Sequence, residues 1–238
     1  MVLILSVLFI SALIKSSIGF GESMLAMPLL LLLMDVQSAS PLIFLVAASL
    51  TVLILITSWK EIDIRAAWIF MLAALVGTPF GVWGLISLPS RWLTAALGGI
   101  LILAGLHNIF QPKTRRSNRA YWGIFFGFFA GMLSGAYNIS GPPTVLYGSI
   151  KGWSPEEFRA TLQGLFLPVT IIKLFGYGVA GLWTQEVLTY FAFALPFVLF
   201  AFWIGQRVHQ KMPKEKTKMI LHSATTIFGV TLLAQSFG

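Results

Sequence analysis

Long apolar stretches separated by short polar ones run along the whole chain. A helix that spans a membrane needs about 20 mostly apolar residues, because each residue adds about 1.5 Å to its length. Six stretches meet this requirement: residues 41–58, 66–88, 92–110, 160–182, 187–206 and 219–237. The pattern therefore predicts an all-α integral membrane protein.

Two further apolar regions, residues 1–34 and 121–150, are too long for one straight span. At about 1.5 Å per residue each would extend some 45–50 Å, whereas the hydrocarbon core is roughly 30 Å thick. Residues 16–23 and 134–143 interrupt them with serine, glycine and proline. Glycine adopts unusual dihedral angles and proline lacks a backbone donor, so each region is predicted to be two half-helices joined at a break. The second half-helix of region 121–150 would begin at Ser140 or Gly141, followed by two prolines.

The distribution of Lys and Arg decides how these two regions enter the membrane. The chain has 16 Lys and Arg against 8 Asp and Glu, and only 10% of its residues are charged. If all eight segments crossed, the loops would carry 6 positive residues on one side and 8 on the other. If the two overlong regions return to their own side, 13 lie inside and only Arg91 lies outside. Because cytoplasmic loops retain Lys and Arg, we predict six spans and two re-entrant hairpins, with both chain ends outside.

The order of one hairpin and three spans occurs twice, in residues 1–110 and 121–238, joined by a cytoplasmic linker at 111–120. In this topology the two halves have opposite orientations in the membrane, which is typical of many secondary transporters. A constant offset of 117 residues aligns similar side chains in the two halves. The aligned pairs are Ser17 with Ser134, Phe20 with Tyr137, Ser23 with Ser140, Pro79 with Pro196, and Phe80 with Phe197. The sequence thus predicts two inverted repeats.

The breaks of the two hairpins are the candidate binding site. Inverted hairpins would bring their tips together near the bilayer midplane, where each returning half-helix offers free N–H groups and a positive dipole end. Such a helix terminus binds anions. The polar and glycine residues expected to line it are Ser17, Gly19, Gly21, Ser23, Asn138, Ser140 and Gly141.

Three charged residues fall inside apolar segments: Lys15, Glu22 and Lys173. A charge at the bilayer centre costs roughly 2.5–3.5 kcal/mol on insertion scales, so each needs a partner or a purpose. One interpretation is that the lysines hold an anionic substrate, with Glu22 as counter-charge or as the group that couples transport to a proton. The alternatives are a structural ion pair between Lys15 and Glu22, or a Lys15 side chain that reaches the membrane interface.

Several other classes of function find little support in the sequence. The chain has no Cys, and its three histidines are far apart, so neither a metal site nor a cofactor is expected. Its positive charge lies in loops between apolar runs, which argues against nucleic acid as a partner. The absence of a nucleotide-binding motif leaves a proton or the membrane potential as the driving force. A homo-oligomer, an anion channel and an integral-membrane lipid-phosphate phosphatase stay open, although the phosphatase lacks paired glutamates and a Ser/Arg phosphate loop.

The Gly-rich breaks carry a resemblance to a known family. Gly19-Phe20-Gly21 through Met27-Pro28-Leu29-Leu30, and Gly131-Met132-Leu133-Ser134-Gly135 through Gly141-Pro142-Pro143, resemble the two copies of its motif. Gly77-Thr78-Pro79-Phe80-Gly81 is similar to a Gly-x-Pro-x-Gly stretch of the same family, TauE/SafE. The resemblance implies a multi-pass transporter, not an enzyme, in the bacterial inner membrane. Its implied substrates are small sulfur-containing anions of the sulfite, thiosulfate, sulfonate or sulfoacetate type. Glu22 and Ser23, and Asn138-Ile139-Ser140, depart from the family pattern at the expected site.

Overall fold

The computed structural model describes residues 1–18, 21–58, 68–110, 119–153, 168–209, 230–232 and 234. Within these ranges every regular element is a helix and there is no strand, so the predicted all-helical fold is confirmed. Three of the described helices contain a segment long and apolar enough to cross a membrane: Val36–Leu53, Trp68–Ser87 and Gln185–Arg207.

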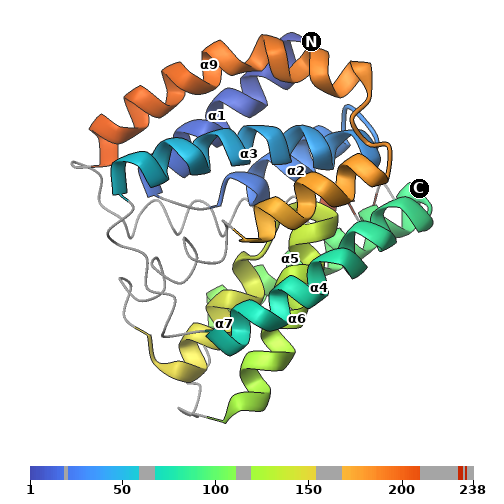
Figure 1. Ribbon diagram of the computed structural model, residues 1–238, viewed down its shortest axis with the longest axis vertical. Coiled ribbons are helices and arrows are strands. Elements are labelled where there is room, and N and C mark those ends of the chain that lie inside the picture. Colours follow the sequence, from blue (N-terminus) through green and yellow to red (C-terminus); the bar gives the residue numbers. More distant parts are fainter. Residues whose placement is uncertain are drawn as a thin grey trace. The chain divides into compact units, whose positions relative to one another are not determined.

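The helices follow the predicted apolar stretches closely. In chain order they are α1 (Val2–Ile18), α2 (Glu22–Leu31), α3 (Val36–Ser58), α4 (Trp68–Ser87), α5 (Ser90–Phe110), α6 (Ala120–Tyr137), α7 (Gly141–Lys151) and α9 (Gln185–His209) (Figure 1). A further helix, Pro168–Val179, lies in the predicted span 160–182. Most of the predicted span 219–237 lies outside the described residues.

Both overlong apolar regions are broken where the sequence indicates. The helix α2 begins after Gly21, whose φ of 93° is a left-handed conformation that glycine adopts without strain. The helix α6 ends at Asn138, which has a φ of 59°. The Asn138 N–H donates to the Ser134 carbonyl at 3.0 Å, and the Ile139 N–H donates to the Leu133 carbonyl at 3.3 Å. These bonds satisfy carbonyls that a helix end would otherwise leave open.

The chain packs as two compact units, and each draws on both halves of the sequence. The first comprises Met1–Leu50, Leu88–Pro112 and Leu182–Gly238, and the second comprises Thr51–Ser87 and Lys113–Gly181. In the first unit α9 packs on α1, and in the second α4 packs on α6 (Figure 1). At the offset of 117 residues, Trp68 at the start of α4 aligns with Gln185 at the start of α9. Each of these two aligned helices packs on a helix from the other half of the sequence.

Glycines bring α4 and α6 into backbone contact. A Cβ atom added to Gly77 or Gly81 of α4 would overlap the carbonyl oxygen of Phe128 or Met132. A Cβ on Gly131 of α6 would overlap the carbonyl of Ala74. Because small residues let helix backbones approach closely, the glycines of the Gly77–Gly81 stretch have a packing role at this interface.

Candidate functional site

The three charged residues of the apolar segments are all buried. Lys15 is 1% exposed, Glu22 is 6% exposed and Lys173 is 7% exposed. They are the only charged side chains that are buried in the part of the chain that the structure describes. Lys15 and Glu22 belong to the first unit, whereas Lys173 belongs to the second. Among the described residues, each unit therefore contains one buried lysine.

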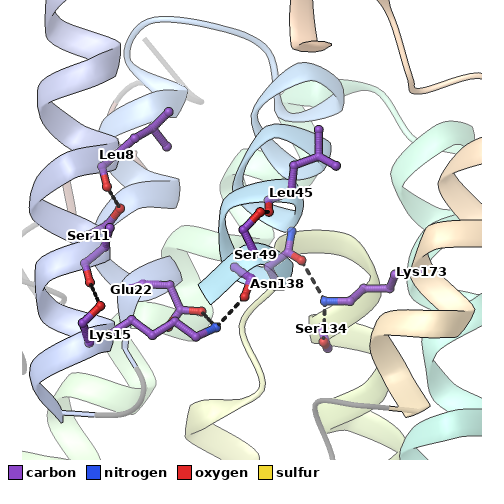
Figure 2. A network of polar contacts seen from close by, with 12 residues as sticks. Leu8, Ser11, Lys15, Glu22, Leu45, Ser49, Ser134, Asn138 and Lys173 are labelled. Atoms are coloured by element: carbon purple, nitrogen blue, oxygen red, sulfur yellow. Dashed lines mark hydrogen bonds and ion pairs between the residues drawn. The ribbon is translucent and has the colours of Figure 1, made fainter. Parts of the chain in front are cut away.

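In the first unit, Lys15 and Glu22 form an ion pair across the break between α1 and α2. The Lys15 ammonium donates to Glu22 Oε1 at 2.8 Å and to the Ala47 carbonyl of α3 at 3.2 Å (Figure 2). Lys15 lies in the last turn of α1 and Glu22 is the first residue of α2. A carboxylate in the first turn of a helix is also stabilised by the helix dipole. The predicted pair is thus present, and Lys15 lies inside the protein instead of reaching the membrane interface.

Ser23, the next residue of α2, has a buried hydroxyl with no partner. Its side chain is 3% exposed, and its Oγ is the only buried side-chain N or O atom among the described residues that makes no hydrogen bond. An unsatisfied buried polar group costs roughly 1–3 kcal/mol. Buried polar groups are otherwise almost always hydrogen-bonded, so this hydroxyl is an exception among the described residues.

In the second unit, Lys173 is held at the end of α6. Its ammonium donates to Asn138 Oδ1 at 2.8 Å and to Ser134 Oγ at 3.2 Å (Figure 2). Tyr177, one turn further along the same helix, is fully buried and donates its hydroxyl hydrogen to the Gly135 carbonyl at 2.7 Å. The spacing of four residues places Lys173 and Tyr177 on one helix face. Neither Ser134 nor Tyr177 was among the predicted site residues, although the spacing of Tyr177 from Lys173 is visible in the sequence.

The start of α7 offers fewer backbone donors than the start of α2. Ser140 occupies the N-cap position, but its side chain makes no capping hydrogen bond. Pro142 and Pro143 follow within the first turn and have no N–H. The Thr144 N–H donates to the Ser140 carbonyl at 3.3 Å. Backbone N–H groups were expected to contribute to anion binding at both breaks. Their contribution is therefore weaker at the second break, where side chains supply the polar groups.

The remaining predicted residues are placed as follows. The Ser17 hydroxyl lies 3.5 Å from the Gly205 carbonyl of α9, so one of its contacts is with a neighbouring helix. Gly141, the first residue of α7, is partly buried. Gly19 lies outside the described residues. The structure thus brings together Lys15 with Glu22, and Lys173 with Asn138.

Apolar helices that break at polar residues and bury charged side chains are typical of membrane transporters. Residues 3–232 match the family model described as Sulfite exporter TauE/SafE. The match covers nearly the whole chain, and the chain belongs to this family. It is therefore a multi-pass membrane transporter of a family that exports sulfite, and not an enzyme, as the sequence predicted.

One curated relative supports this assignment. The chain is 26% identical over 222 residues to the "Probable sulfite/organosulfonate exporter TauE" of Cupriavidus necator. The alignment covers 90% of this chain and 86% of that protein. No solved structure matches the chain.

Proposed function

We propose that the chain is a secondary transporter for a small sulfur-containing anion of the sulfite, thiosulfate, sulfonate or sulfoacetate type, in the bacterial inner membrane. Family membership and the sulfite and organosulfonate named for the relative support this substrate class. The chain has no nucleotide-binding motif, which is in keeping with transport driven by ion gradients.

The observation that carries the proposal is that, in the part of the chain that the structure describes, each packed unit buries a lysine beside a helix break. Removing an ammonium from water is expensive unless hydrogen bonds and an opposite charge replace the water. In a membrane segment, such a residue is by default a candidate functional group. An oxyanion carries the charge and the acceptors that complement a lysine surrounded by hydroxyl and amide groups.

In the first unit the anion would bind to Lys15, the Ser23 hydroxyl and the N–H groups at the start of α2. Gly21 has no side chain, so an anion can approach the backbone there. In the second unit the anion would bind to Lys173, with Ser134, Asn138, Ser140 and Gly141 as further donors. Alternating access between inverted halves completes the proposal. The packing of α4 on α6 and of α9 on α1, each across the two sequence halves, supports a repeat of this kind.

Transport assays in liposomes test the proposal. We expect saturable uptake and counterflow of labelled sulfite or an alkanesulfonate by the wild type. Lys173→Met should abolish most of this flux, because it removes the charge while keeping most of the side-chain volume. Lys15→Met is combined with Glu22→Gln, so that no unpaired carboxylate stays buried. Lys151→Met is the matched control, since Lys151 is only partly buried at the end of α7.

Three outcomes would contradict parts of the proposal. Full flux in both lysine variants would remove the lysines from the transport mechanism. Conductance without saturation or counterflow would favour an anion channel. Absence of flux for every sulfur anion, in wild-type protein that elutes as one folded species, would refute the substrate class.

A further inference from the structure

In the first unit, the Glu22 carboxylate lies beside Lys15 in the position that a bound anion would take. Glu22 Oε1 lies 2.8 Å from the Lys15 ammonium, as an oxygen of a bound oxyanion would. Ser23, the next residue of α2, has a buried hydroxyl that makes no hydrogen bond. Lys15 is thus neutralised in the empty protein, while a hydroxyl donor in the same turn of α2 stays unused.

The other charged side chains in the described part of the first unit are exposed. On the helices that pack against α1, no residue of α3 is charged, and α2 contributes only Glu22. The charged residues described on α9, Glu186 and Arg207, are exposed, and Arg207 packs over the ring of Trp203 at 3.4 Å. Asp35 and Arg91, elsewhere in the described part of the first unit, are exposed as well. Among the described residues of the first unit, Lys15 and Glu22 are therefore the buried charged side chains.

We propose that the Glu22 carboxylate pairs with Lys15 in place of the substrate anion when no substrate is bound. Glu22 must then take up one proton for each substrate anion that binds to Lys15. This inference rests on the proposed function, because it concerns the same site. If Glu22 stayed ionised, a second negative charge would share one ammonium in a buried centre. Like charges at such short range repel strongly where water is excluded. Protonation of Glu22 removes that repulsion and frees Lys15.

The charges balance in each step. The Glu22 carboxylate accepts a proton from water on the open side, and its ion pair with Lys15 breaks. Lys15 keeps its own proton and donates to an oxygen of the entering anion, which can also accept from Ser23. For a monoanion the net charge of the centre is zero before and after binding. Release of the anion returns the proton to water and restores the ion pair.

The consequence is cotransport of one proton with each anion, in the same direction. The direction of net flux then follows the product of the proton and anion concentrations on the two sides. For a monoanion the cycle is electroneutral, so the membrane potential should not drive it.

The test uses methanesulfonate, the anion of a strong acid, because it carries no proton of its own at accessible pH. Wild-type protein is reconstituted into liposomes that contain a pH-sensitive dye. An inward methanesulfonate gradient should acidify the lumen with one proton per labelled anion, and a potential set with potassium and valinomycin should not change this ratio. A ratio of zero, with flux present, would overturn the inference while leaving the proposed function intact. Absence of methanesulfonate and sulfite flux would instead count against the proposed function.

A pair of matched variants assigns the proton to Glu22. Glu22→Gln should retain methanesulfonate counterflow but lose proton movement and lose accumulation driven by a pH gradient. Glu186→Gln, which changes an exposed carboxylate at the start of α9, should keep both. Proton movement that persists in Glu22→Gln would overturn the assignment. If that variant does not fold, the wild-type ratio of protons to anions still decides whether protons are coupled.

Discussion

The backbone contact between α4 and α6 makes a quantitative prediction about Gly131. A Cβ atom at this position would overlap the Ala74 carbonyl oxygen, and it would lie 2.6 Å from the carbonyl carbon and 2.7 Å from the Cα atom of Ala74. Ordinary van der Waals contact begins at 3.4 Å. All three atoms belong to backbone, so no side-chain rotation relieves the overlap.

Gly131→Ala must therefore move one helix away from the other by about 1 Å. Overpacking of a well-packed interface costs typically 1–3 kcal/mol, and we expect about 2–3 kcal/mol because the obstacle is rigid. The separation also weakens the dispersion contacts made by the neighbouring glycines Gly77 and Gly127, which approach the partner helix equally closely. The higher intrinsic helix propensity of alanine, worth about 1 kcal/mol in an exposed helix, offsets only part of this loss.

Reversible unfolding in mixed micelles, followed by circular dichroism, measures this free energy of unfolding. Gly84→Ala is the matched control on α4, because a Cβ there meets no atom within 4 Å. The control should be neutral or slightly stabilising. If Gly131→Ala were as stable as Gly84→Ala, the close approach of the two backbones, and the frame that it provides for Ser134 and Asn138, would be refuted.

Substitutions at two further positions separate stability from binding. Ser23→Ala removes an unsatisfied buried hydroxyl, so it should stabilise the empty protein by about 1–2 kcal/mol while weakening anion binding about 5- to 10-fold. Unfolding experiments with and without methanesulfonate measure both effects. A loss of stability in the empty protein would contradict the reasoning. Asn138→Ala should lose the contact with Lys173 and also strain a residue with a φ of 59°, at a cost of about 1–2 kcal/mol. Asn138→Gly loses the same contact without the strain, so it should unfold at a higher temperature than Asn138→Ala yet show the same loss of flux. Equal stability of the two variants would exclude the backbone role.

Much of the helical organisation could be predicted from the sequence because its causes are local. The apolar stretches correspond to α3, α4, α5 and α9, within a few residues at each end. The breaks at Gly21 and Asn138 follow from residue types that tolerate a left-handed conformation. The pairing of Lys15 with Glu22 also follows from a short separation along the chain, across one break.

The polar partners of Lys173 could not be predicted, because they lie 35 and 39 residues away in sequence. Ser134 begins the second break and aligns with Ser17, but the local pattern does not show that its hydroxyl accepts a hydrogen bond from Lys173. The lack of a partner for the Ser23 hydroxyl was equally unpredictable, since it depends on which groups all the surrounding helices present. Ser23 was predicted as a site residue for its position at the break and not for this property.

By itself, the sequence determined the membrane character of the chain, the positions of most helices, the two breaks and the three charged residues that needed an explanation. Each of these depends on residue type and spacing over a few turns. Only the tertiary structure decided that α4 packs on α6 and that α9 packs on α1. It also decided which oxygens accept hydrogen bonds from the two buried ammonium groups. These contacts depend on the close approach of segments that are distant in the sequence. A glycine, which has no side chain, or a backbone carbonyl in a fixed position determines which of the contacts form.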